Sequence, residues 1–155
     1  MLAWLLVACL GVAQDAPRKP IETAHLTVTT SAGDTVTARK TVPLHVDVSP
    51  KPTMHVYSPG QEGYIAVTVT LDADAPVVAA GKPKYPAPQK YFMPALNETQ
   101  LVFSKPFRIT QDVTRKKDAP AGPLTVKATV RYQACDDKIC YLPKNVPVEW
   151  TVRYN

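Results

Sequence analysis

"VPVEWTVRY" (residues 146–154) alternates apolar and polar side chains, and this period of two indicates a half-buried β-strand. Its apolar face carries Val146, Val148, Trp150 and Val152. Similar runs, alternating or rich in β-branched residues, are "AHLTVTT" (24–30), "TVPLHVDV" (41–48), "GYIAVTVTL" (63–71) and "PLTVKATVRYQ" (123–133). No stretch has a helical period with caps, so the pattern predicts an all-β protein.

Turn signals separate these runs at fairly regular spacing: "SAGD", "SPGQEG", "DADAP" and "KKDAPAG". Proline occupies 16 of 155 positions, about twice the usual ~5%, which argues against long helices. We expect about seven to nine strands arranged as an immunoglobulin-like β-sandwich rather than a barrel.

The N-terminal run "MLAWLLVACLGVA" is apolar, uncharged and too short to span a membrane. It fits a secretory signal peptide over residues 1–13, with the small residues Gly11 and Ala13 before the cut. A flexible leader over 14–22 and one sandwich domain over 23–155 follow. Because Leu6-Val7-Ala8-Cys9 resembles a lipobox, a lipid anchor at Cys9 is the alternative. Either interpretation predicts a periplasmic or secreted protein.

The formal charge of +5 is scattered along the chain rather than gathered on one stripe. The small basic cluster of Arg115, Lys116 and Lys117 precedes a turn and is typical of a solvated loop. A nucleic-acid site would need a basic stripe interleaved with aromatic residues. We therefore expect no nucleic-acid partner.

The stretch "RYQACDDKICYLP" (131–143) holds the two cysteines that remain after signal cleavage, Cys135 and Cys140. The pair suits the tip of a hairpin or a short excursion between strands. A structural disulfide is one interpretation, but the loop that it closes is small, and stabilisation by a disulfide grows with loop length. Exposed disulfides are reduced more easily, so the position favours a redox pair.

A metal site is a further interpretation of the cysteine pair. Zinc usually has four ligands, so His25, His45 or His55 would have to complete the set. Met54 and His55, together with the thiols, would offer ligands of the kind that copper binds. A histidine at a strand end is more often a packing or surface residue, and we expect neither metal nor cofactor.

Asp136 and Asp137 add negative charge beside Cys135, which opposes thiolate formation, and no helix follows to lower the thiol pKa. We therefore expect a pair that reacts slowly with random disulfides and reacts well only inside a specific complex. Tyr132 and Tyr141 flank the sulfurs and are candidates for apolar docking area.

Residues 81–98 interrupt the strand pattern with four prolines and an aromatic group that includes Tyr85, Tyr91 and Phe92. The segment is long for a hairpin loop, and long ordered loops are often functional. A proline-rich edge connection whose aromatic residues cover the core is equally consistent with the sequence.

The run Tyr132-Gln133-Ala134-Cys135, followed by Cys140-Tyr141 and Pro143, resembles the N-terminal periplasmic domain of the thiol:disulfide interchange protein DsbD. "MHVYSPG" (54–60) is similar to an early strand of that family, and the spacer between the cysteines is one residue shorter than in its best-known members. The resemblance covers residues 23–155 and implies an immunoglobulin-like fold with a redox-active disulfide.

The resemblance also implies roles for individual residues. Cys135 and Cys140 exchange disulfides, and Cys140 forms the mixed disulfides with partners. A cap loop shields the pair, and its candidate residues are Tyr91, Phe92 and Met93. Family members take electrons from a thioredoxin-like or membrane donor and pass them to periplasmic disulfide proteins, including those of cytochrome c biogenesis.

Family proteins continue into a membrane domain and a thioredoxin domain. This sequence ends at Asn155, so separate partners are expected for both steps. The competing hypothesis is a non-enzymatic binding module in which the disulfide is a local structural link.

Overall fold

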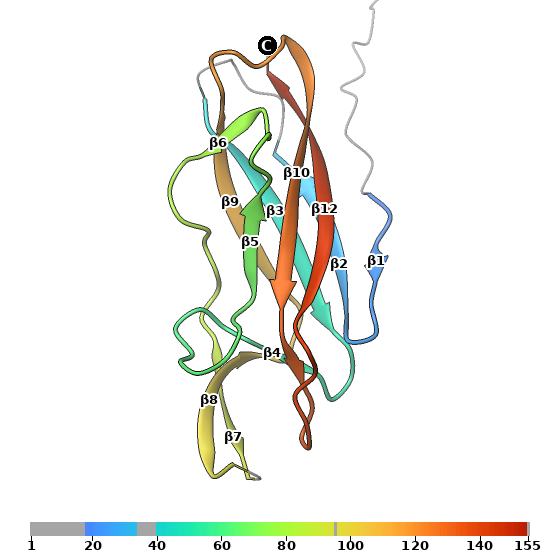
Figure 1. The fold of residues 1–155 in the computed structure, drawn as a ribbon, viewed down its shortest axis with the longest axis vertical. Coiled ribbons are helices and arrows are strands. Elements are labelled where there is room, and N and C mark those ends of the chain that lie inside the picture. Colours follow the sequence, from blue (N-terminus) through green and yellow to red (C-terminus); the bar gives the residue numbers. More distant parts are fainter. Residues whose placement is uncertain (1–17, 34–39, 95, 155) are drawn as a thin grey trace, which may run out of the picture.

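The chain folds as an immunoglobulin-like β-sandwich, as the sequence predicts. The computed structural model describes residues 18–33, 40–94 and 96–154, and these contain twelve strands in three antiparallel sheets and no helix (Figure 1). The predicted signal peptide (1–13), including Cys9, lies outside the described residues.

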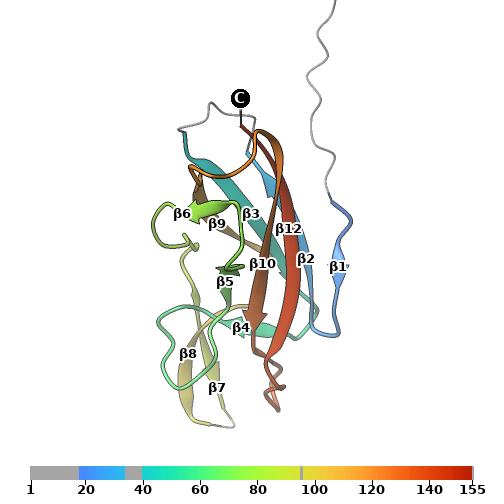
Figure 2. The same ribbon diagram turned by 45° about the horizontal axis from the view of Figure 1, so that its top comes forward.

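Two sheets form the sandwich. One has five strands, in the order β1 (Ile21–Glu22), β2 (Leu26–Ala32), β3 (Val42–Pro50), β9 (Phe107–Arg115) and β6 (Val77–Ala79). The other has three, in the order β12 (Lys144–Tyr154), β10 (Gly122–Tyr132) and β5 (Thr68–Leu71). Figure 2 shows the two sheets from a second direction. Each buries one face, which is the usual way for an antiparallel sheet to reach stability.

The core lies where the buried faces of the two sheets meet. In β10 and β12 buried and more exposed residues alternate, so Val126 and Trp150 point inward while Lys127 and Glu149 face outward. Trp150 is 1% exposed, and its Nε1–H donates a hydrogen bond of 3.0 Å to the backbone oxygen of His45 in β3. This bond links the two sheets and satisfies the one polar group of the largest core side chain.

A third sheet extends the sandwich at the end away from the C-terminus (Figure 1). Its order is β11 (Ala134–Cys135), β4 (His55–Tyr57), β8 (Glu98–Phe103) and β7 (Gln89–Met93). β7 and β8 form a hairpin with the register Gln89–Val102 to Met93–Glu98. The cysteine loop and this hairpin project from the same end of the molecule.

Several strand boundaries differ from the expected ones. Residues 81–98 do not form one irregular loop, because β7 occupies Gln89–Met93. In the run 63–71 only Thr68–Leu71 forms a strand, and Ala66 makes an isolated bridge to Tyr57. The described residues hold twelve strands where seven to nine were expected. The sequence pattern does not predict β6, β8 and β9; in β9 the buried Gln111 interrupts the apolar face that would have marked it.

The expected flexible leader, residues 14–22, is described from Arg18 onward. Ile21 and Glu22 form β1 and pair with Val28 and Thr27 of β2. The Arg18 guanidinium donates hydrogen bonds to Glu149 and Thr151 of β12. The described part of this segment therefore lies along the sandwich.

Truncation of the central tryptophan tests the packing of the two sheets. Trp150→Ala should lower the free energy of unfolding by about 3–5 kcal/mol, since it removes a large buried side chain and leaves a cavity. Phe92→Ala is the matched control: Phe92 is 55% exposed, so its truncation should change stability by about 0.5 kcal/mol or less. Urea unfolding followed by circular dichroism measures both. Equal losses would contradict the assigned core.

Candidate redox site

Cys135 and Cys140 are joined in a disulfide with their Cα atoms 4.0 Å apart. Cys135 is the last residue of β11, and the two cysteines face each other as an isolated antiparallel bridge. On either side of this bridge, backbone hydrogen bonds from Asp136 N to Ile139 O (3.0 Å) and from Tyr141 N to Ala134 O (2.8 Å) close the loop. The predicted hairpin tip is therefore present, and the backbone itself brings the sulfurs together.

The two cysteines lie in different environments. Cys135 is fully buried in a small cluster with Tyr57 and Val102, against which Tyr64 and Tyr91 pack. Its position follows from the pairing of β11 with β4, in which Cys135 is opposite His55. Cys140 is exposed. An incoming thiolate can therefore approach Cys140, whereas Cys135 is placed to be the leaving group.

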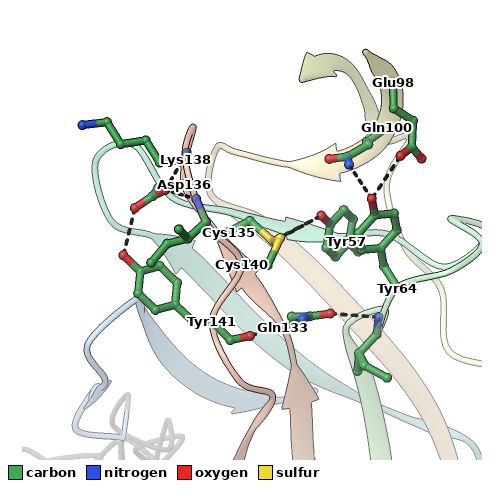
Figure 3. The surroundings of a disulfide bond; sticks show 12 residues. Tyr57, Tyr64, Glu98, Gln100, Gln133, Cys135, Asp136, Lys138, Cys140 and Tyr141 are labelled. Atoms are coloured by element: carbon green, nitrogen blue, oxygen red, sulfur yellow. Dashed lines mark hydrogen bonds between the residues drawn. A yellow bond between two sulfur atoms is a disulfide. The ribbon is translucent and has the colours of Figure 1, made fainter. Parts of the chain in front are cut away.

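The Tyr57 hydroxyl lies beside both sulfurs, 3.2 Å from Sγ of Cys135 and 3.3 Å from Sγ of Cys140 (Figure 3). Disulfide sulfurs carry no hydrogen, so the hydroxyl is the donor in this contact. A donor at this position stabilises negative charge on the sulfur that leaves when the disulfide is attacked.

Tyr57 is held in place by aromatic and polar neighbours. Its ring stacks on Tyr64 with centroids 4.2 Å apart. The Tyr64 hydroxyl donates to Glu98 (3.0 Å) and accepts from the Gln100 amide (3.1 Å). Burial, with smaller contributions from Tyr64 and Glu98, raises the pKa of Tyr57 to about 12. The Tyr57 hydroxyl therefore keeps its proton at physiological pH and remains a donor.

Asp136 organises the loop between the cysteines. One carboxylate oxygen accepts hydrogen bonds from the backbone N–H groups of Lys138 and Ile139, both 2.8 Å long. The other oxygen accepts from the Tyr141 hydroxyl at 2.8 Å (Figure 3). These bonds, led by the one from Ile139, lower the pKa of the Asp136 carboxyl and keep it ionised.

Gln133 connects the start of the loop to its surroundings. Its side-chain oxygen accepts from the backbone N–H of Ile65 (3.2 Å), and its amide donates to the backbone oxygen of Tyr141 (3.2 Å). Gln133, from the run Tyr132-Gln133-Ala134-Cys135, thus holds the segment that follows Cys140 beside the segment that precedes Cys135.

The two tyrosines expected to offer docking area differ in position. Tyr132 is fully buried, and its hydroxyl donates to Thr23, so it has no surface for a partner. Tyr141 is partly exposed; its ring lies 4.4 Å from that of His25, and its hydroxyl bonds Asp136. Tyr132 supports the site from within the core, and Tyr141 supports the loop.

The candidate cap residues lie in β7, close to the cysteine loop. Tyr91 packs beside the cluster of Cys135 and donates a hydrogen bond to Asp137. Met93 is buried and Phe92 is 55% exposed. Of the three, Tyr91 makes a direct contact with the loop between the cysteines.

Tyr57, Tyr64, Gln100 and Glu98 were not among the predicted site residues. They come from segments far from the cysteines along the chain. Tyr57 in β4 contacts the sulfurs, Tyr64 stacks on Tyr57 from the segment after β4, and Glu98 and Gln100 in β8 contact Tyr64. "MHVYSPG" (54–60) carries one signal, because it is similar to a family strand and contains Tyr57. The buried Gln100 within β8 gave no comparable signal.

Within the described ranges, no three His, Cys, Asp or Glu side chains are grouped as a metal site would require. The same residues include no helix of the length and apolar character needed to cross a bilayer.

The fold and site together define an immunoglobulin-like domain with a local disulfide at one end. A family model described as "Thiol:disulfide interchange protein DsbD, N-terminal" matches residues 23–149. The chain belongs to this family. No curated protein matches the sequence.

Several solved structures are similar to the chain, and two of them are N-terminal domains of DsbD and ScsB. The N-terminal periplasmic domain of ScsB from Proteus mirabilis is 11% identical with a TM-score of 0.63, and the match covers 88% of this chain and 51% of that one. The reduced DsbD N-terminal domain of Neisseria meningitidis is 15% identical with a TM-score of 0.47, covering 68% and 74%. The chain thus spans about half the length of the ScsB domain, and this likeness concerns the fold.

Removal of the Tyr57 hydroxyl tests its contact with the sulfurs. Tyr57→Phe should slow reduction of the disulfide by dithiothreitol about tenfold, since a hydrogen bond to a charged group contributes about 1.5–3 kcal/mol and about 1.4 kcal/mol changes a rate tenfold. Because the pKa of Tyr57 is raised to about 12, the ratio of the two rates should be constant from about pH 6 to 9. Acid quench, alkylation and mass spectrometry measure the rates.

Tyr64→Phe is the matched control for that measurement. It removes a hydroxyl from the ring stacked on Tyr57, but that hydroxyl reaches Glu98 and Gln100 instead of sulfur. Its rate should stay within about twofold of wild type. Equal slowing by both variants would mean that looser packing around Tyr57, and not the loss of its hydroxyl, controls the rate of reduction.

Proposed function

We propose that this domain exchanges thiols and disulfides with partner proteins through Cys135 and Cys140 and relays electrons from a reduced donor to oxidised clients. The observation that carries the proposal is the asymmetry of the disulfide: Cys140 is exposed, and Cys135 is fully buried beside the Tyr57 hydroxyl. Family membership supports the same function.

The first half of the cycle reduces the domain. A donor thiolate attacks Sγ of Cys140, a mixed disulfide forms, and the Cys135–Cys140 bond breaks. Cys135 leaves as a thiolate beside the Tyr57 donor and takes up a proton. The second thiol of the donor then attacks the mixed disulfide, which releases Cys140 and leaves the donor oxidised by two electrons.

The second half passes the two electrons on. The exposed Cys140 thiolate attacks a client disulfide and forms a new mixed disulfide. Cys135 then attacks Cys140, restores the intramolecular bond and releases the client as a dithiol. Buried Cys135 acts only within the chain in both halves, which limits reaction with unselected disulfides.

The surface around Cys140 suits contact with another protein. Four of the exposed large apolar side chains lie on the two projecting hairpins, namely Phe92 and Leu96 near the β7–β8 turn, and Ile139 and Leu142 beside Cys140. Leu142 is 82% exposed. Exposed apolar groups that gather at one end of a domain are typical of a protein-binding surface.

The proposed partners are a thioredoxin-like or membrane electron donor and disulfide-containing client proteins. The proposed location is the periplasm, which is supported by the family and by the periplasmic ScsB domain of similar fold. A link to cytochrome c biogenesis, a lipid anchor at Cys9 and the cap function of Tyr91, Phe92 and Met93 stay predictions.

Single-cysteine variants test which sulfur reacts with partners. Cys135→Ser leaves the exposed Cys140 and should form mixed disulfides with oxidised glutathione or an oxidised thioredoxin. Cys140→Ser leaves the buried Cys135 and should react at least about tenfold more slowly, since reaction requires access to the sulfur. Mass spectrometry of the native proteins measures both, and denatured samples, which should react equally, are the control. Equal native rates would contradict the proposed roles.

The wild-type disulfide must also be reducible while the domain stays folded. Titration with glutathione and circular dichroism should give a reduction potential between roughly −120 and −270 mV with unchanged β structure. A potential below about −300 mV, or loss of structure on reduction, would favour the binding module with a structural disulfide.

A surface substitution separates docking from chemistry. Leu142→Ser should slow exchange with a reduced thioredoxin several-fold and leave the rate with dithiothreitol unchanged, because the small thiol needs no protein interface. Val78→Ser, on β6 of the sandwich, is the control, since Val78 is also exposed (45%). Equal effects of Leu142→Ser on both reductants would contradict the docking surface.

A further inference from the structure

Asp136 and Asp137 are adjacent and acidic, yet they make different contacts. Both were expected to act through their negative charge on the thiols. Asp136 points into the loop and bonds the backbone N–H groups of Lys138 and Ile139 and the Tyr141 hydroxyl. Asp137 faces β7, where it accepts a hydrogen bond from Tyr91.

The contacts of Asp136 hold the loop in the shape that the disulfide needs. Two of these bonds fix the backbone of Lys138 and Ile139, between the cysteines. The third joins Asp136, which follows Cys135, to Tyr141, which follows Cys140. With the backbone bond from Asp136 N to Ile139 O, they define a closed turn. This turn sets the two cysteines opposite each other with their Cα atoms 4.0 Å apart.

Closure of the loop affects the redox equilibrium because the disulfide forms only from the closed shape. Any opening of the loop in the dithiol state would separate the two thiols and lower the fraction of protein that can form the disulfide. The equilibrium constant for oxidation is proportional to the closed fraction, just as an apparent affinity is reduced by the fraction of competent protein. A side chain that stabilises the closed loop therefore makes the disulfide harder to reduce.

We propose that Asp136 is a positioning residue that sets the reduction potential of the Cys135–Cys140 pair by keeping the loop closed in the dithiol state. It acts through the backbone of residues 138–139 and through Tyr141, without contact with either sulfur. This inference rests on the proposed exchange function, since it concerns the potential of the same pair.

The reaction that reports the potential is balanced without another reactant. The dithiol form and one oxidised glutathione give the disulfide form and two reduced glutathiones. Two thiol hydrogens move to glutathione, one S–S bond forms in the domain, and one breaks in glutathione. The equilibrium constant is measured by alkylating the free thiols and quantifying both forms by mass spectrometry.

Asp136→Ala should lower this equilibrium constant about tenfold, which corresponds to a potential about 30 mV less negative. Asp136→Asn keeps a side-chain oxygen for the two backbone N–H groups, so it should restore part of the loss. Tyr141→Phe removes the third contact alone and should shift the constant in the same direction by a smaller factor. If Asp136 acts by positioning, the equilibrium constant should therefore fall most in Asp136→Ala, less in Asp136→Asn and least in Tyr141→Phe. A pure charge effect would not give this order.

Asp137→Ala is the matched control. It removes an equal charge from the neighbouring position but no bond within the turn, so it should leave the equilibrium constant within about twofold of wild type. An equal shift in Asp136→Ala and Asp137→Ala would overturn the proposal in favour of a charge effect. An unchanged constant in Asp136→Ala would overturn it as well.

The wild-type titration separates this inference from the function on which it rests. If the wild-type pair is reduced only with loss of structure, the exchange function fails. If wild type is reduced while folded and Asp136→Ala matches it, only the role of Asp136 fails. Circular dichroism of every variant in both redox states shows that each comparison is made between folded proteins.

Discussion

The antiparallel pairing of β10 with β12 is the constraint on which the rest of the structure depends. It runs without interruption from Gly122 opposite Tyr154 to Tyr132 opposite Lys144. Because the register is continuous, the segment between the two strands must leave and return at one end of the sheet. This connecting segment contains both cysteines, so the pairing that builds the sandwich core also sets where the disulfide can form.

The segment between β10 and β12 does not extend freely into solvent. β11 pairs with β4, which buries Cys135 and directs the rest of the loop outward. The same β4 supplies Tyr57, which lies on the same face of this ladder as Cys135, so its hydroxyl reaches the sulfurs. Burial of one cysteine, exposure of the other and the hydroxyl donor therefore have one backbone cause, the short β4–β11 ladder.

Much of the fold and part of the site could be predicted from sequence. The alternation in β3 and β12 predicts core strands, and the position of Cys135 and Cys140 between two strands favours a close pair at a hairpin tip, which the structure shows as a disulfide. Tyr57 could not be placed, since its contact with Cys135 joins residues 78 positions apart and nothing in local periodicity predicts such a pairing. The buried Gln111 in β9 likewise depends on packing between segments, which local patterns do not encode. The sequence suggests only a negative charge for Asp136 and Asp137, whereas in the structure the two carboxylates accept hydrogen bonds from different groups.

The division of the interior into two clusters has a consequence for how this domain can diversify. The large cluster fills the sandwich, while Tyr57, Val102 and Cys135 form a small one of their own at the redox end. The small cluster has only three buried members, so substitutions there change fewer buried contacts than substitutions within the sandwich core. Reactivity at the redox end can therefore vary while the sandwich keeps most of its packing, so one framework can carry sites of different reactivity.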